Sequence, residues 1–588
     1  MRRFGIIFMV ILFGLGFQQV QGKSLRMRLF QDFKDAKISY AQKLAYQGYW
    51  VFAPEKLPER YRGFSRVPAK CATSIVQELR ENLHKLSETD RAFFRFIFLR
   101  PSPGMLPDSY DSPKGYFKIH YTTSGINSVP ADDFNGNSIP DWIEETGKIF
   151  DHCYEFEIDT LGYEKPPVDN PNDPQIDVYM YNLNAYGFTT PDSQFVDGDR
   201  QVASYIEIDN NFKGSGFATH GLDALKVTAA HEMFHVIQLG YILRSTDFYF
   251  YEMSSVWMED QVYNTINDYY ANLPDFFNYP DLPLTTYNGA YEYGAAVWLR
   301  FLSLRHGRSI VRQIWQNMPD YNSLNAMQRV FVQEGSDFST EFATFGIWNY
   351  FTGQRADTTK YYKEGDHFPE IYVSQVVPFE LDTAISGSAT FLTSHYSKLI
   401  PQEPQYYHLI QSYDTPANWM CEAIVAKDNA YGTYVFHPDN GGAIGYMPAL
   451  SEIITIISNT QTPEKYDYTS GFQKKRNYTL KIVQGKGYFV YKNSFKKIFP
   501  NPFIVGGDAI LSLEFTVEKK SFANFLVLNE NGRPVYSVPL GRVAKGFHSR
   551  KVIWNGKADN GNPVPSGIYL AAISGDGLFI MTKLAVVR

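Results

Sequence analysis

The chain is poor in cysteine and histidine, has no excess of positive charge and has almost no long apolar run. It contains 3 Cys and 12 His in 588 residues, and its formal net charge is −7. Three cysteines are too few for a disulfide scaffold, and a negative net charge gives no reason to expect nucleic-acid binding. The longest apolar run, residues 4–17, is shorter than the ~20 residues that span a bilayer. The composition is otherwise that of a globular protein, and the length predicts several domains.

The apolar run is typical of a secretory signal peptide, which we assign to residues 1–22. Two arginines precede the run, and residues 20–22 form an imperfect cleavage site. We therefore expect a secreted or cell-surface protein that has no transmembrane helix after signal removal. One disulfide is permitted outside the cytoplasm. We expect Cys71 to pair with Cys153, which leaves Cys421 unpaired.

The chain contains an HExxH motif, HEMFH at residues 231–235. On a helix, His231 and His235 are four residues apart and lie on one face, so both imidazoles can bind one zinc ion. Glu232, beside them, can take the proton of a zinc-bound water. The surrounding residues 225–240 are apolar and contain no proline, which favours a buried helix. The alternative is a surface helix that carries the pattern by chance.

A catalytic zinc usually has three protein ligands and one open position. The segment at residues 251–263 offers Glu252 and Glu259, which lie on one helical face about 10 Å apart, so one zinc ion cannot bind both. HExxH followed by E-x-x-[small]-x-x-x-E resembles the gluzincin clan, which includes thermolysin and the aminopeptidase N group. The resemblance implies that Glu252 is the third ligand. Glu259 is then a supporting carboxylate, or else the alternative ligand.

The segment AYEYGAAVWLRFL at residues 290–302 resembles the Y-x-K-G segment of the aminopeptidase N group. The resemblance implies that the Tyr291 hydroxyl stabilises the oxyanion, although Tyr293 stands where that group has lysine. The alternative is that Tyr291 only packs. No G-x-M-E-N segment precedes the motif, so residues 204–210 could instead be the edge strand that lines the cleft, with a loop at residues 186–201.

A second metal is predicted upstream, in DDFNGNSIPDWIEE. Counted from its second aspartate, oxygen donors occur at the spacing of an EF-hand-like calcium loop. The six proposed ligands, with one backbone carbonyl at position 7, are Asp133, Asn135, Asn137, Ile139, Asp141 and Glu144. Such loops resemble calcium loops of secreted bacterial proteins, and the ion would stabilise the fold. The alternative is an Asn/Gly turn that caps the following helix.

Three recurrent segments resemble a family of secreted bacterial zinc metalloproteases. They are D-x-N-G-N-x-I-P-D, V-T-A-A-H-E-x-F-H and W-M-E-D, at residues 133–141, 227–235 and 257–260. Near the C-terminus, P-N-P-F is followed by W-N-G-x-x-x-x-G-x-x-V-P-S-G-I-Y-L at residues 554–570. This run resembles the immunoglobulin-like fold of flagellar hook-capping proteins and type IX secretion sorting domains, which implies the outer-membrane secretion machinery as a partner.

The predicted fold is an α+β gluzincin-like metallopeptidase domain followed by all-β immunoglobulin-like sandwich domains. After the signal peptide we expect a helical pro-segment or cap (residues 23–114), the zinc domain with its calcium loop (115–375), a β-sandwich (376–494) and a sorting domain (495–588). The predicted function is hydrolysis of protein or peptide substrates by a zinc-activated water, with Glu232 as general base and Zn²⁺ and Ca²⁺ as cofactors. The alternative is a non-enzymatic surface adhesin or binding protein on a metallopeptidase scaffold.

Overall fold

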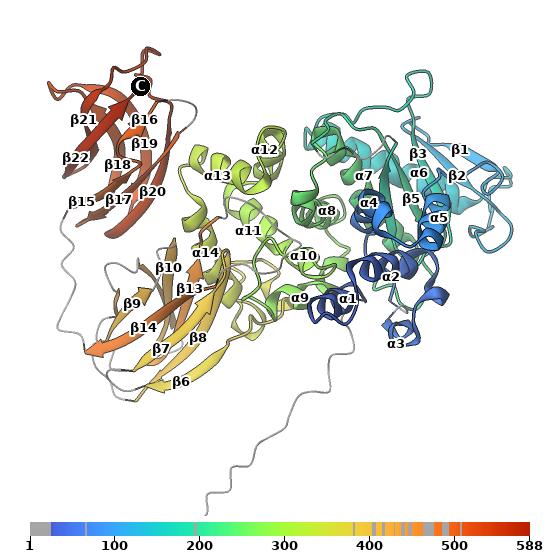
Figure 1. Ribbon diagram of the computed structural model, residues 1–588, viewed down its shortest axis with the longest axis horizontal. Helices are drawn as coiled ribbons and strands as arrows, with labels where there is room; N and C mark the ends of the chain where they lie inside the picture. Colours follow the sequence, from blue (N-terminus) through green and yellow to red (C-terminus); the bar gives the residue numbers. More distant parts are fainter. Residues whose placement is uncertain are drawn as a thin grey trace, which may run out of the picture.

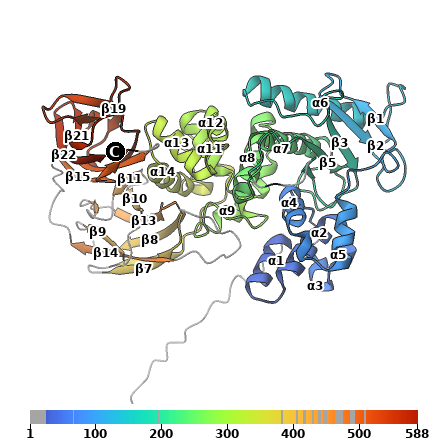
Figure 2. The same ribbon diagram turned by 45° about the horizontal axis from the view of Figure 1, so that its top comes forward.

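The computed structural model describes residues 25–64, 67–192, 196, 198–379, 383–402, 407–413, 418–427, 430–436, 442–444, 450–462, 475–484, 493–505 and 509–588. The predicted signal peptide lies outside these residues. Among the helices described, none is long and apolar enough to cross a membrane. Figures 1 and 2 show helices at the N-terminal end, a mixed sheet beside them, a central group of helices and two all-β parts. The multidomain arrangement with a helical N-terminal part and β-rich C-terminal parts is as predicted.

Amphipathic helices form the N-terminal part. Ser39 caps the second helix through a capping box with Gln42, which satisfies free backbone N–H groups at its start. The apolar faces of the helices form a core that also contains Leu183, Ala185 and Phe188 of the neighbouring sheet region. The helices are α1 (Leu25–Lys34), α2 (Tyr40–Phe52), α3 (Glu59–Arg62), α4 (Thr73–Asn82) and α5 (Glu88–Ile97).

A five-stranded sheet follows, with the order β1-β2-β3-β5-β4. Its central strands are parallel, whereas β1 and β4 pair antiparallel at the two edges. The strands are β1 (Asp108–Asp111), β2 (Phe117–Tyr121), β3 (Ile176–Tyr181), β4 (Gly187–Pro191) and β5 (Ser204–Asp209). The edge strand beside the motif helix is therefore β4, which lies in the stretch 186–201 that we expected to be a loop. Residues 204–210, which we expected to form the edge, instead contain the internal strand β5. Helix α6 (Asp141–Tyr154) packs against the sheet and the motif helix.

The central part is helical and contains the largest apolar core. The motif helix α7 (Gly221–Tyr241) packs on α8 (Phe248–Val262) and on strands β4 and β5. The other helices are α9 (Leu273–Phe277), α10 (Tyr291–Gly294), α11 (Val297–His306), α12 (Ser309–Asn317), α13 (Ser323–Gln333) and α14 (Phe338–Tyr350). Because strands lie on one side of α7 and helices on the other, α7 lies at the centre of this half of the molecule.

The first all-β part consists of two antiparallel-rich sheets around their own core, with the orders β11-β10-β13-β8-β6 and β12-β9-β14-β7. Tyr396 joins it to α14 by donating a hydrogen bond to the Gly346 carbonyl over 2.9 Å. Its strands are β6 (Gln375–Phe379), β7 (Ala384–Ala389), β8 (Thr393–Pro401), β9 (Tyr407–Tyr413), β10 (Trp419–Lys427), β11 (Ala430–Phe436), β12 (Gly442–Ile444), β13 (Leu450–Asn459) and β14 (Arg476–Gln484).

The second all-β part is a sandwich of sheets β15-β17-β20 and β16-β22-β21-β18-β19 around a separate core that includes Trp554. Lys551 connects it to α13 through a 3.0 Å hydrogen bond to Gln328. Its strands are β15 (Ser494–Phe499), β16 (Phe503–Ile504), β17 (Ala509–Val517), β18 (Ser521–Leu528), β19 (Pro534–Val543), β20 (Gly546–Trp554), β21 (Gly567–Gly575) and β22 (Leu578–Val587). The predicted two-sheet architecture is therefore present at the C-terminus.

Candidate metal centre

The two histidines of the motif face one point beside α7. Their Nε2 atoms are 3.1 Å apart, and the side chains of His231 and His235 are buried. Each Nδ1 atom has a partner on the opposite side of its ring. His231 Nδ1 lies 2.7 Å from Glu259 Oε1, and His235 Nδ1 lies 2.7 Å from Gln238 Oε1. Partners of this kind fix the ring orientation and leave both Nε2 atoms available to a metal.

Helix α8 places the two candidate glutamates on different sides of His231. Glu252 Oε2 lies 3.3 Å from His231 Nε2 and 3.7 Å from His235 Nε2. Glu259, two helical turns further on, contacts the Nδ1 side of His231 and forms a buried ion pair with Lys70 at 3.0 Å. The carboxylate that faces the two Nε2 atoms is therefore Glu252, whereas Glu259 orients a ring.

These donor atoms fit a tetrahedral zinc ion. Zinc–nitrogen and zinc–oxygen bonds of about 2.0–2.2 Å place neighbouring donors about 3.3–3.6 Å apart, and the three spacings among His231, His235 and Glu252 are 3.1, 3.3 and 3.7 Å. Glu252 Oε2 is buried and accepts no hydrogen bond from the residues that the structure describes. A buried carboxylate oxygen of this kind is costly unless a cation or a donor compensates it.

The charges around the donors also favour a cation. Burial by itself would raise the pKa of Glu252, but its contacts with both imidazoles hold that pKa well below its ordinary value. Burial would lower the pKa of His231, yet Glu252 and Glu259 raise it to about 9. The same negative potential that stabilises an imidazolium favours a divalent cation at this position.

Glu232 lies beside the donor atoms and is held by β4. Thr189 Oγ1 donates a hydrogen bond to Glu232 Oε2 over 2.9 Å, and Thr73 Oγ1 lies 3.4 Å from the same oxygen. The other oxygen, Oε1, is buried and has no hydrogen-bond partner among the described residues. One oxygen therefore orients the carboxylate, while the second is available for proton transfer.

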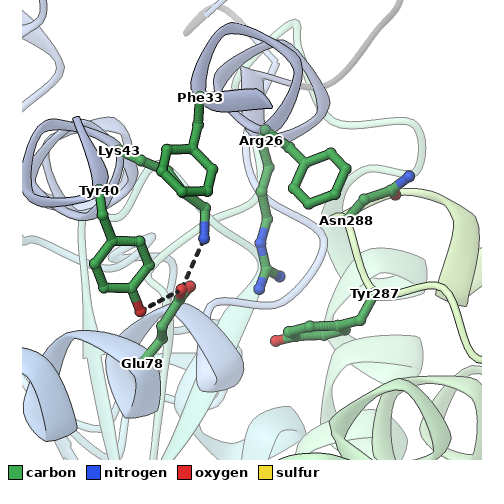
Figure 3. Close-up of a pocket in the computed structure, with 8 residues that line it drawn as sticks. Arg26, Phe33, Tyr40, Lys43, Glu78, Tyr287 and Asn288 are labelled. Carbon is green, nitrogen blue, oxygen red and sulfur yellow. Dashed lines mark hydrogen bonds and ion pairs between the residues drawn. The ribbon is translucent and has the colours of Figure 1, made fainter. Parts of the chain in front are cut away.

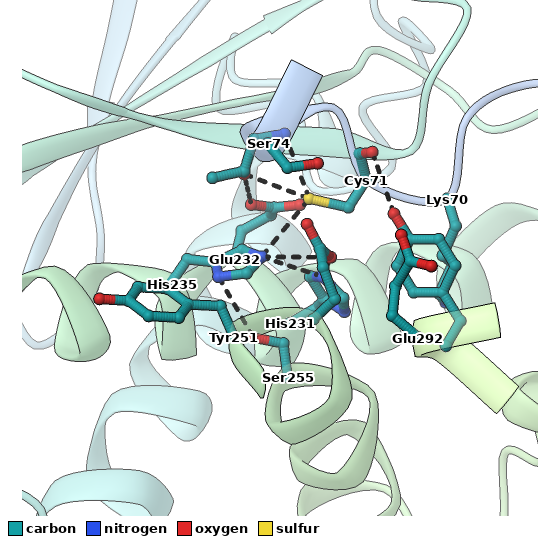
Figure 4. A network of polar contacts seen from close by, with 12 residues as sticks. Lys70, Cys71, Ser74, His231, Glu232, His235, Tyr251, Ser255 and Glu292 are labelled. Carbon is teal, nitrogen blue, oxygen red and sulfur yellow. Dashed lines mark hydrogen bonds and ion pairs between the residues drawn. The ribbon is translucent and has the colours of Figure 1, made fainter. Parts of the chain in front are cut away.

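Cys71, which the sequence placed in a disulfide, lies at this centre instead (Figure 4). Its Sγ atom is 3.4 Å from His235 Nε2, and donor atoms of Cys71, His231, Glu232 and His235 all lie within 4.8 Å of one another. Cys153 is free and buried on α6, where its Sγ contacts Tyr263 Oη at 3.9 Å. The predicted Cys71–Cys153 disulfide is therefore wrong, because tertiary packing directs the two thiols to different partners.

Tyr291, the predicted oxyanion donor, does not face the centre. Its hydroxyl donates a hydrogen bond to the Leu282 carbonyl over 2.9 Å, and its ring packs on Phe276. Tyr293 lies nearer to the centre, because its hydroxyl donates a hydrogen bond to the Cys71 carbonyl over 3.3 Å. Burial raises the pKa of Tyr293, and the negative charge of Glu252 raises it further. Of the two tyrosines, the one whose hydroxyl contacts Cys71 is thus Tyr293, and not the predicted Tyr291.

The predicted calcium ligands are gathered into one exposed loop before α6. The Asn135 and Asn137 side-chain amides both donate to Glu144, over 2.8 Å each. Asp133 accepts hydrogen bonds from backbone N–H groups of residues 136–138, and Asp141 accepts one from residue 134. The Ile139 N–H donates to Asn137 Oδ1 over 2.8 Å. Because these donors satisfy one another, the loop suits both a calcium site and a helix-capping turn, and calcium stays a prediction.

Comparisons with known proteins identify parts of the chain. Residues 142–352 match the "Family of unknown function (DUF6055)", and residues 502–577 match the "FlgD Ig-like domain". The second match identifies the C-terminal sandwich as immunoglobulin-like, as predicted. The first match contains α7 and α8 but not the N-terminal helices, and neither match spans half of the chain. The search of curated proteins found no match.

Similar solved structures share only small parts with this chain. One is PorZ, a bacterial surface component of the type IX secretion system of Porphyromonas gingivalis, with 17% identity over 28% of this chain and 22% of that chain and a TM-score of 0.13. Another is a β-glucuronidase of Parabacteroides merdae, with 10% identity over 33% and 27% of the two chains and a TM-score of 0.13. A β-glucuronidase of Ruminococcus gnavus has 12% identity, over 31% and 37%, and a TM-score of 0.11. At these scores the likenesses carry no conclusion about fold or activity.

Proposed function

We propose that this protein is a zinc-dependent peptidase of the gluzincin type that acts outside the cell. The observation that carries the proposal is the arrangement of His231, His235 and Glu252, whose donor atoms lie within about 0.2 Å of the mutual distances of a tetrahedral zinc site. Glu232, on the same helix as the two histidines, supplies the acid–base group that such a site needs for hydrolysis.

The chain's own residues have distinct roles in this proposal. Zinc, when bound, would supply Lewis acidity toward a carbonyl and toward a water molecule. Glu232 would take a proton at Oε1 and return it to the leaving amine, while Thr189 holds Oε2 in place. Tyr293, which donates to a backbone carbonyl in this structure, would donate to the carbonyl of a bound substrate.

The neighbouring strand supports a peptide as the substrate. β4 is the edge of its sheet, and Thr189 on this strand contacts Glu232. A sheet edge binds an extended peptide by backbone hydrogen bonds, which positions one peptide bond with respect to the side chains below it. A small-molecule substrate would not need such an edge.

An extracellular location is part of the proposal. Residues 1–22 have the pattern of a secretory signal, and the immunoglobulin-like match at residues 502–577 is compatible with a sorting domain for type IX secretion. The outer-membrane secretion machinery is therefore the proposed partner, and calcium available outside cells would occupy the loop before α6.

The test compares Glu232→Gln with the wild type and with the control Glu207→Gln. Glu207 is also a buried glutamate, but it accepts hydrogen bonds from Tyr181 and Thr190 and does not face the histidines. Bound zinc is measured by mass spectrometry. Hydrolysis of a peptide library is followed before and after a cut at residues 102–105, an exposed connector between the N-terminal helices and the sheet.

We expect about one zinc ion per chain in all three proteins. We expect Glu232→Gln to lower turnover by about 10²–10⁴-fold, as loss of a general base does, whereas the control stays near wild type. Absence of zinc from the wild type, or hydrolysis by Glu232→Gln at the wild-type rate, would refute the proposal.

A further inference from the structure

A short segment of the N-terminal part pairs with residues 184–187, which lead into β4, through an isolated parallel bridge between Ala69 and Ala185. The Ala69 N–H donates to the Asn184 carbonyl over 3.0 Å, and the Tyr186 N–H donates to the Ala69 carbonyl over 2.9 Å. The Ala72 N–H donates to the Gly187 carbonyl over 3.0 Å. Residues 69–72, which we call the covering segment, thus occupy backbone groups where the chain enters the β4 edge, at which an extended peptide would bind.

The covering segment directs Cys71 at the zinc donors. A thiolate bound to zinc at about 2.3 Å lies about 3.5 Å from a nitrogen donor of the same tetrahedral ion. Cys71 Sγ lies 3.4 Å from His235 Nε2 and forms no disulfide. The buried Glu252 Oε2, which has no hydrogen-bond partner among the described residues, faces the same histidine at 3.7 Å. The sulfur therefore lies at ligand spacing from one histidine donor and within 4.8 Å of the other.

Neighbouring contacts hold the covering segment in register. Lys70 forms buried ion pairs with Glu259 and Asp268, and the Tyr293 hydroxyl binds the Cys71 carbonyl. Further along the chain, Arg26 of α1 donates a hydrogen bond to Ser74 Oγ over 2.9 Å. The sulfur of Cys71 is thus positioned by contacts on both sides.

The result is a closed centre. Side chains of the proposed zinc ligands, of Glu232 and of Cys71 are each at most 2% exposed to solvent. A polypeptide cannot reach a peptidase centre that is buried to this degree. The covering segment and the helices around it would have to move before a substrate could bind.

The packing of these helices against the body is incomplete at one place (Figure 3). A pocket lies between α1, α2 and α4 and the connection that precedes α10. On one side Lys43 pairs with Glu78 over 2.7 Å, and on the other the Arg26 guanidinium lies 4.2 Å from the Tyr287 ring centre. The N-terminal helices therefore meet the central helices across a partly open seam rather than through a continuous core.

We propose that the covering segment keeps the enzyme latent, with the Cys71 thiolate as the fourth zinc ligand and residues 69–72 in the place of the substrate. The inference rests on the proposed peptidase function. On binding, the Cys71 thiol loses one proton to solvent and displaces one water from the zinc, so no oxidant or reductant is needed. Cleavage of the exposed connector at residues 102–105 would allow the N-terminal helices to leave and water to return.

The first test measures the zinc–sulfur bond directly, by X-ray absorption at the zinc edge on the full chain without its signal peptide. We expect one sulfur neighbour at about 2.3 Å in the wild type. We expect the same neighbour in Cys153→Ser, a matched control because Cys153 is equally free and buried. Cys71→Ser should retain zinc and lose the sulfur neighbour. Cobalt substitution gives an independent signal, since a thiolate–cobalt band in the near ultraviolet should vanish only in Cys71→Ser.

The outcomes separate this inference from the function on which it rests. A wild type that contains zinc but no sulfur neighbour would overturn the inference and leave the peptidase proposal standing. A wild type that binds no zinc would overturn both. A sulfur neighbour that persists in Cys71→Ser would also overturn the inference, because another thiol would then be the ligand.

The second test concerns latency. A recognition sequence for a specific protease is inserted between Pro103 and Gly104, both in the connector, and the protein is assayed before and after the cut. We expect peptide hydrolysis to rise at least tenfold as the zinc–sulfur signal disappears. A cut chain from which the N-terminal helices have separated, but which still shows the sulfur neighbour, would refute the inference. Full activity before the cut would refute it as well.

Discussion

The assignment of the third zinc ligand is most sharply tested by exchanging each of two glutamates for glutamine. Glu252 and Glu259 are both on α8, and both are 1% exposed. Glutamine preserves the size of each side chain and removes its charge. The two variants are therefore matched in chemistry, helix and burial, and they differ in whether the carboxylate faces the Nε2 or the Nδ1 side of His231.

The expected magnitudes differ by about an order of magnitude. Structural zinc sites with four ligands gain about 10–16 kcal/mol on binding, so one ligand accounts for roughly 3 kcal/mol, or about 10²-fold in Kd. Glu252→Gln should weaken zinc binding by at least this factor. Glu259→Gln keeps an acceptor for His231 Nδ1 and leaves Lys70 paired with Asp268, so we expect a loss near 10-fold, the lower end for groups that orient a ligand.

The assay is competition for zinc against a chromophoric chelator, with circular dichroism to show that each variant is folded. Wild type, Glu252→Gln and Glu259→Gln are titrated at one pH and one protein concentration. Equal losses in the two variants would mean that the distances at His231 do not identify the ligand. A larger loss in Glu259→Gln would transfer the ligand role to that residue.

Three further predictions concern stability. Lys70→Met leaves Glu259 and Asp268 buried without their cation, and should lower the free energy of unfolding by about 3–5 kcal/mol in urea titrations; an unchanged midpoint would show that the pair is not needed. Burial raises the pKa of Glu207 from 4.5 to about 7, so its contribution to stability is complete below pH 4.5 and is lost as pH rises through about 7. Wild type should therefore lose about 3 kcal/mol over this range relative to Glu207→Gln, and parallel pH profiles would argue against it. Chelation of calcium should lower the melting temperature of wild type but not of Asp133→Ala. If calcium is present at 100 times its Kd, the loss corresponds to about 2.7 kcal/mol. Identical shifts in the two proteins would exclude the loop as the calcium site.

Local patterns in the sequence predicted the helices around the centre well. The spacing of His231 and His235 depends only on helical geometry, and α7 and α8 contain the predicted segments. The spacing of Glu252 and Glu259 could not by itself decide between them, because both lie on one helical face, and only the resemblance favoured Glu252. The position of α8 along α7, which depends on tertiary packing, brings Glu252 to the Nε2 atoms and Glu259 to His231 Nδ1.

Other features depend on contacts between distant parts of the chain. Cys71 is 164 residues from His235 in the sequence. Nothing in the residues around Cys71 marks it as a neighbour of the histidines. Residues 187–191 contain glycine and proline and read as a loop, yet pairing with β5 makes them an edge strand. Tyr291 does not face the centre because its hydroxyl donates to the Leu282 carbonyl, a contact that nothing in the local sequence marks.

The core shared by the N-terminal helices and the β4 region has a consequence for the lifetime of the activated protein. Leu183, Ala185 and Phe188 pack against these helices, and residues 69–72 cover the strand edge. Departure of the helices would expose apolar side chains beside unpaired backbone groups, a combination that templates pairing with another chain. The proposed peptidase, once freed of these helices, would therefore lose activity by self-association at a rate that increases with its own concentration. A bound substrate would cover the exposed strand edge and slow this self-association. The proposed peptidase would therefore remain active only at low concentration or with substrate bound.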